Sequence, residues 1–192
     1  MRNPAMTARS LFVLAFAAAL LVSFGCGGGG GNGGTPAPAL ACSDSGTAGA
    51  NAITMSCGGA TGGTTELVNI VMGGPAASTT DVRGFNLDVA YDPAKLEFVP
   101  AASYTSPPFG ANALILVTLE NGVPGKVVVS IQQVSGDPPA SFPAGETVVL
   151  GLSFRTVSGI AVAPTPVTFE NAEATNASAT VSFASSLMLS YQ

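Results

Sequence analysis

Few residue types in this chain could carry out acid, base or nucleophilic chemistry. Its 192 residues include no His, so a nucleophile cannot be paired with an imidazole base. Carboxylates remain, and Glu170 with Glu173 and Asp88 with Asp92 are pairs that lie close together in sequence. Residues four apart in a strand share a face but are about 13 Å apart, and Asp92 is placed to cap a turn. We therefore expect no catalytic residues.

Metal ligands are equally scarce. No Asp-x-Asp-x-Asp loop of the kind that holds calcium occurs in the sequence. The three cysteines have no His to complete a transition-metal site. We expect neither a metal site nor another cofactor.

The first 26 residues have the order of an export signal. Two arginines precede an apolar run at residues 11–24, which is about 14 residues long where a membrane span needs about 20. Residues 23–26 (Ser-Phe-Gly-Cys) resemble the bacterial lipobox, whose cysteine is diacylated and becomes the new N terminus. We expect residues 1–26 to be a signal peptide and Cys26 to be lipidated, as in an exported, membrane-anchored bacterial lipoprotein. Ordinary cleavage after Ala41 is the alternative.

An odd number of cysteines is unusual in an oxidising compartment. If Cys26 carries the lipid, Cys42 and Cys57 are left to form a disulfide. A metal-binding pair is the alternative. Residues 27–41 are rich in Gly and Pro and cannot bury a core. We therefore assign residues 27–64 to a tether that contains a disulfide loop.

The overall composition favours short strands joined by turns. Charged residues make up 9% of the chain, with 24 Gly and 14 Pro, and no helical periodicity persists after residue 60. The net charge is −5, and it falls to about −7 if the two arginines of the signal are removed. The chain therefore lacks the basic surface that nucleic acids require. We expect one all-β domain at residues 65–192.

Alternating apolar residues predict eight or nine strands in this domain. They fall at residues 66–72, 83–91, 96–98, 113–119, 126–133, 147–155, 166–169, 179–183 and 187–191. In the strand at 147–155 we expect Val148, Leu150, Leu152 and Phe154 on the inward face, and Val149 on the outward face with Gly151, Ser153 and Arg155. Turns recur without helical crossovers, which predicts an antiparallel two-sheet sandwich of jelly-roll type. A closed barrel is the alternative.

Residues 82–98 (VRGFNLDVAYDPAKLEF) carry apolar alternation into a Tyr-Asp-Pro-x-x-Leu turn. This stretch resembles the cohesin domain. Residues 145–154 are similar to the family's late strand, and residues 167–173 (VTFENAE) to the segment that follows it. The resemblance covers roughly residues 65–192. It implies a nine-stranded jelly roll, similar to cellulose-binding modules, that binds a calcium-loaded dockerin through a flat sheet face.

The same resemblance implies which residues contact a partner. Outward residues of the strand before the Tyr-Asp-Pro turn take part in recognition, and these positions are Gly84, Asn86 and Asp88. The family's best-known pattern has a polar residue and an acid where Gly84 and Asn86 stand, so the choice of partner does not transfer. The alternative is that Asn86 and Asp88 only solvate an exposed face.

These observations lead us to expect a non-catalytic, extracytoplasmic binding module that attaches a dockerin-bearing protein at the cell surface. One alternative is a carbohydrate-binding module linked to polysaccharide degradation. Such modules stack sugars on exposed aromatic rings, for which Tyr104, Phe109 and Tyr191 are the candidates in loops or near the end of the chain. The other alternative is a structural envelope or adhesion lipoprotein.

Overall fold

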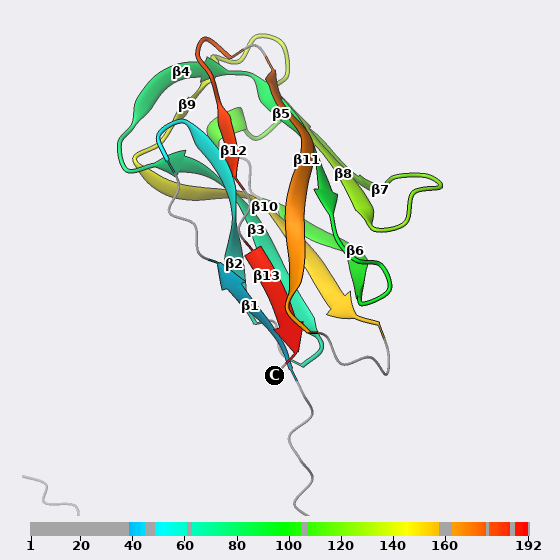
Figure 1. Ribbon diagram of the computed structural model, residues 1–192. Helices are drawn as coiled ribbons and strands as arrows, with labels where there is room; N and C mark the ends of the chain where they lie inside the picture. The colour runs from blue at the N-terminus through cyan, green and yellow to red at the C-terminus, as the bar shows by residue number, and fades with distance from the viewer. Residues whose placement is uncertain are drawn as a thin grey trace, which may run out of the picture. The chain divides into compact units, whose positions relative to one another are not determined.

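Strands make up most of the part of the chain that the computed structural model describes (Figure 1). The structure describes residues 39–44, 49–60, 63–104, 107–157, 163–175, 177–184 and 187–191, which all belong to one unit, Thr35–Gln192. A single 3-10 turn, η1 (Pro107–Phe109), interrupts the described strands. Within those ranges, no helix has the length and hydropathy needed to span a membrane.

The described strands form two large sheets and one small one. The six-stranded sheet has the spatial order β1 (Leu40–Asp44), β13 (Leu187–Tyr191), β11 (Thr165–Thr175), β5 (Gly84–Ala90), β8 (Lys126–Gln132) and β7 (Leu114–Leu119). The five-stranded sheet has the order β12 (Ser182–Ala184), β2 (Ala52–Ala60), β3 (Thr65–Gly74), β10 (Gly145–Thr156) and β6 (Leu96–Tyr104). Strands β4 (Ser78–Val82) and β9 (Ala140–Phe142) pair separately. All of these pairings are antiparallel except that of β12 with β2, as expected for the predicted sandwich.

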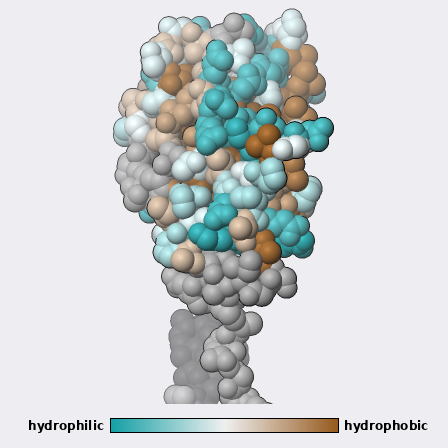
Figure 2. Space-filling model, turned by 45° about the vertical axis from the view of Figure 1, so that its right-hand side comes forward, coloured by the Kyte–Doolittle hydropathy of each residue, from teal (hydrophilic) through white to brown (hydrophobic). Residues whose placement is uncertain are grey.

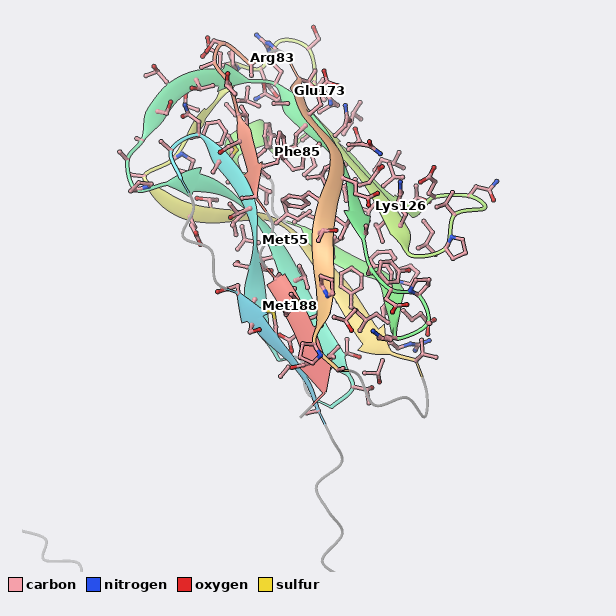
Figure 3. The ribbon with its side chains drawn as sticks, in the orientation of Figure 1. Met55, Arg83, Phe85, Lys126, Glu173 and Met188 are labelled. Atoms are coloured by element: carbon pink, nitrogen blue, oxygen red, sulfur yellow. A yellow bond between two sulfur atoms is a disulfide. The ribbon has the colours of Figure 1, made fainter. Side chains whose placement is uncertain are left out.

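The core lies between the two large sheets and is filled by the inward residues of their central strands. On β5 and β8 these residues are Phe85, Leu87, Val89, Val127, Val129 and Ile131, and on β3 and β10 they include Val68, Ile70, Met72, Leu150, Leu152 and Phe154. All are at most 1% exposed. Figure 3 shows Phe85 and Met55 inside the sandwich. Successive strand residues point to opposite sides of a sheet. The residues that alternate with these buried ones on β5 and β8 therefore lie on the outer surface of the six-stranded sheet.

The Tyr-Asp-Pro turn carries the chain from β5 in one sheet to β6 in the other. The Oδ1 atom of Asp92 accepts a hydrogen bond from the main-chain N–H of Ala94 at 3.0 Å, and this bond is the main reason that the pKa of Asp92 is lowered. The main-chain oxygen of Asp92 accepts from Leu96 at 2.9 Å. The prediction that Asp92 caps its own turn is confirmed. Its carboxylate therefore has a local structural role at the end of β5.

The sandwich begins before residue 65, where we had placed its boundary. Residues 40–44 and 52–60, which the composition assigned to the tether, form β1 and β2 in the two large sheets. Leu40 and Ile53 are buried, so the few apolar residues of this segment are enough to pack it against the core. The structure contains the expected Cys42–Cys57 disulfide, which joins β1 in one sheet to β2 in the other.

Strand β10 departs from the predicted alternation at one point. Its register against β3 shifts between Val148 and Leu150, which marks a β-bulge. Val149 is therefore fully buried while Val148 is 37% exposed, so the inward and outward assignments of these two residues were wrong. Leu150, Leu152 and Phe154 face the core as predicted. A short strand, β9, also lies between the strands predicted at residues 126–133 and 147–155, where no strand was expected.

One carboxyl group lies among the inward residues. Glu66 on β3 has the same orientation as Val68, is 2% exposed, and is paired in register with Phe154 on β10. Among the described residues, its Oε2 atom has no hydrogen-bond partner. Burial raises the pKa of Glu66 because the charged form is poorly solvated there.

Candidate functional site

The outward residues of four neighbouring strands form one continuous surface, which we call the outer face. Antiparallel register aligns them in rows across the sheet, since directly paired residues point to the same side. The rows are Thr175, Gly84, Gln132 and Leu114; Glu173, Asn86, Ser130 and Leu116; and Glu170, Asp88, Val128 and Thr118. Strands β11, β5, β8 and β7 each contribute one residue to every row.

The structure places all three predicted contact residues in these rows. Asn86 is exposed, and the Asp88 side chain is 16% exposed. Gly84 is buried, and a Cβ atom there would overlap the carbonyl oxygen of Ile131 on β8. Glycine at position 84 is therefore required for β5 to approach β8 closely, whereas Asn86 and Asp88 present polar atoms on the surface.

The middle of the outer face is a hydrogen-bonded polar network. The Oδ1 atom of Asn86 accepts from the hydroxyl of Ser130 at 2.6 Å and lies 3.5 Å from the Nε2 atom of Gln132. Gln132 Nε2 also donates to the hydroxyl of Thr175 at 2.9 Å. These bonds hold short polar side chains in one orientation, so a partner would meet them with little further loss of conformational entropy.

A charged cluster lies beside this network and is centred on Lys126 (Figure 3). The ammonium nitrogen of Lys126 is 3.2 Å from Glu170, 3.5 Å from Asp88 and 3.5 Å from Glu120. Its hydrogen bond to Glu170 is the main reason that the pKa of Lys126 is raised. Asn171, at a bulge of β11 with φ of 47°, donates to Asp88 Oδ2 at 2.7 Å. Three carboxylates around one ammonium group give the cluster a net negative charge.

Two exposed leucines flank the polar network on β7. Leu114 is 67% exposed and Leu116 is 53% exposed, which are large fractions for apolar side chains. They lie directly opposite Gln132 and Ser130. Figure 2 shows hydrophilic residues in the middle of the surface that it presents, with scattered hydrophobic residues among and around them. The outer face thus combines apolar, polar and acidic groups.

Sequence reasoning identified only part of this site. It singled out Asn86 and Asp88, and it named Glu170 only in a carboxylate pair with Glu173. It missed Lys126, which meets Glu170 from a strand far apart in sequence. It also missed Leu114 and Leu116, although a usable signal existed. Since one side of a sandwich sheet faces solvent, an uninterrupted apolar strand must expose every second residue.

Other candidate residues lie elsewhere. Phe109 is fully buried, with its ring 5.8 Å from that of Phe85, so it does not offer a stacking surface to sugars. The side chains of Tyr104 and Tyr191 lie outside the described residues, as does Cys26 with the rest of the expected signal peptide at residues 1–26.

An apolar pocket of about 490 Å³ lies between the Tyr-Asp-Pro turn and the loop that joins β7 to β8. Glu97 and Glu120 are the acids that line it. Glu97 forms a bidentate ion pair with Arg155 at 2.8 and 2.9 Å, which lowers its pKa. A general acid needs a raised pKa, so this arrangement does not favour proton donation by Glu97.

No family model matches the chain, and no curated protein sequence matches it significantly. Solved structures do resemble it. CaCohA2, in its complex with CaDoc0917, is 17% identical with a TM-score of 0.51, over 70% of this chain and 95% of that one. The solution structure of CaCohA2 from Clostridium acetobutylicum is 13% identical with a TM-score of 0.49, over 73% and 88% of the two chains. A type II cohesin domain from the cellulosome of Acetivibrio cellulolyticus is 14% identical with a TM-score of 0.49, over 72% and 93%.

At these identities the likeness concerns the fold alone. The two-sheet sandwich and the resemblance to CaCohA2 over nearly its whole length agree with the expectation from residues 82–98. The protein therefore has a cohesin-like fold.

Proposed function

We propose that this chain is a non-catalytic binding module that holds a dockerin-type protein module on its outer face. The observation that carries the proposal is the composition of that face, where exposed Leu114 and Leu116 adjoin an ordered polar network around Asn86. Apolar anchors surrounded by satisfied polar groups are typical of protein-binding surfaces. The likeness to CaCohA2, solved in complex with CaDoc0917, also supports a protein partner.

The direct test is calorimetric titration of the purified chain with calcium-loaded dockerin modules. The panel consists of the dockerins encoded in the same genome and representatives of other dockerin classes, each measured with and without a chelator. We expect one class to bind only with calcium, because calcium shapes the dockerin rather than this chain. If no dockerin binds, the proposal is wrong.

The binding dockerin then tests the location of the site. Asn86→Arg places a long charged side chain at the centre of the outer face, and we expect affinity to fall at least about 10-fold, which corresponds to about 1.4 kcal/mol. Arg155→Ala is the control, because this exposed residue lies on the other large sheet. Unchanged thermal unfolding of both variants would show that the fold is intact. Equal affinities of Asn86→Arg and the unsubstituted chain would contradict the proposed site.

We also propose that the module is exported and held at the bacterial cell envelope by a lipid on Cys26. The apolar run at residues 11–24, the Ser-Phe-Gly-Cys segment and the Cys42–Cys57 disulfide support this location. Mass spectrometry of the mature N terminus should find a diacylated Cys26, and Cys26→Ser should release the protein from the membrane fraction. An unmodified N terminus following Ala41 would rule out the lipid anchor.

A further inference from the structure

Strand β7 is an edge strand that lacks the usual protection against pairing. It pairs with β8 on one side, and among the described residues no strand lies on its other side (Figure 1). Its sequence, Leu-Ile-Leu-Val-Thr-Leu, contains no charge, proline or glycine. Exposed edges of this composition readily accept another strand.

The other edges of the two large sheets differ in this respect. Strand β1 is short and ends in Asp44, and its Cys42 is held by the disulfide. Strand β6 contains Glu97 and Pro100 and has an irregular register against β10. Strand β12 has three residues. Charge, proline, irregularity and shortness are the features that block edge pairing. Among the four edge strands β1, β6, β7 and β12, only β7 has none of these protective features.

The register indicates which main-chain groups of β7 point away from the sheet. Glu120 N–H donates to the carbonyl of Lys126 at 3.0 Å, and these residues continue the β7–β8 pairing by one step. Antiparallel pairs alternate between bonded and non-bonded. Ile115, Val117 and Leu119 are therefore at non-bonded positions, and their N–H and C=O groups face outward. The Leu119 carbonyl already accepts a hydrogen bond from Thr118 Oγ1 at 3.3 Å. Ile115 and Val117 are therefore the residues best placed to form main-chain hydrogen bonds with another strand.

We propose that two copies of this chain associate by antiparallel pairing of their β7 strands, with the two-fold axis at Leu116. In this register Ile115 of each copy exchanges main-chain hydrogen bonds with Val117 of the other. Leu116 lies against Leu116, which removes a 53% exposed leucine from water in each copy, and Leu114 lies opposite Thr118.

A second copy fits this edge because the strand is complementary to itself. No charged residue of one β7 opposes a charge on the other, so the usual obstacle to symmetric pairing is missing. Moving the axis by one residue, to Val117, would set Leu114 opposite the carboxylate of Glu120. The Leu116-centred register avoids that contact and sets Leu116 of one copy against Leu116 of the other. It joins the two outer faces edge to edge and covers Leu116, which the proposed binding surface also uses.

The test is the mass in solution of residues 27–192, which contain the whole folded unit and lack the proposed signal peptide and lipid, measured by sedimentation equilibrium. Edge pairing buries a small area, so the concentration series should extend to roughly 1 mM. We expect a monomer–dimer equilibrium. Leu116→Lys and Leu116→Glu should each weaken association at least about 10-fold through like charges across the axis, and an equimolar mixture of the two should form a heterodimer.

Two further variants distinguish main-chain pairing of β7 from non-specific hydrophobic association. Val117→Pro removes an N–H that does not bond β8, so it should leave the fold intact and the protein monomeric. Met188→Lys replaces a 42% exposed residue on β13, away from the proposed axis, and should leave the dimer unchanged. A wild-type monomer throughout the series, or a dimer that survives Val117→Pro, would overturn the proposal.

Discussion

Removing the Cys42–Cys57 disulfide is expected to lower the free energy of unfolding by about 3 kcal/mol. The bridge spans a sequence separation of 15 residues, and a loop of that size contributes about this much by restricting the unfolded chain. It also joins the two sheets, since β1 and β2 lie in different ones. The variant Cys42→Ala/Cys57→Ala keeps small apolar groups at these half-buried positions, and chemical denaturation in a Cys26→Ser background measures the loss.

Reduction supplies the matched control for this prediction. A reductant should destabilise the chain that has the bridge by a similar amount and leave the double variant unchanged. Stability that is the same with and without the bridge would mean that β1 and β2 are held fully by packing and strand pairing, contrary to the expectation.

Neutralising the buried carboxyl group of Glu66 is expected to stabilise the protein. Its raised folded-state pKa means that the native state favours the protonated form, so its contribution to stability is greatest below the unfolded pKa of about 4.3 and is lost as the pH rises. At neutral pH the native state must bury the charge or take up a proton. Glu66→Gln removes that penalty and should raise the free energy of unfolding by about 1–3 kcal/mol at pH 7.

The pH dependence distinguishes this cause from a change in packing. The difference between Glu66→Gln and the unsubstituted chain should shrink as the pH falls from 7 to about 4, because Glu66 then carries a proton in both states. Glu146→Gln is the control, since Glu146 is exposed on β10. A difference that stays constant with pH would attribute the effect to packing rather than to the charge of Glu66.

The central strands could be predicted from sequence because apolar and polar residues alternate clearly there. In β5, Phe85, Leu87 and Val89 alternate with Asn86 and Asp88, and the structure buries the first set as the pattern predicts. The bulge in β10 could not be found in this way. Val148, Val149 and Leu150 are all apolar, so a bulge that changes which of them faces the core does not alter the pattern of apolar and polar residues.

The strands before residue 65 were missed for a different reason. Their Gly, Ser and Thr residues give them the composition of a tether. They pack against the core through only a few buried residues, such as Leu40 and Ile53. The charged cluster was missed because it depends on strand register. Lys126 meets Asp88 and Glu170 only after β8, β5 and β11 have paired, and neither the order of the strands nor their alignment can be read from periodicity.

The disulfide also determines how a pulling force would pass through this module. A force applied to the chain before Leu40 reaches β1, which pairs along its length with β13. After Ala41 the force arrives at Cys42, and the covalent bridge transmits it directly to Cys57 on β2 in the opposite sheet. Residues 43–56 therefore cannot be drawn out while the bridge is intact. Tension is shared by both sheets instead of peeling one strand away.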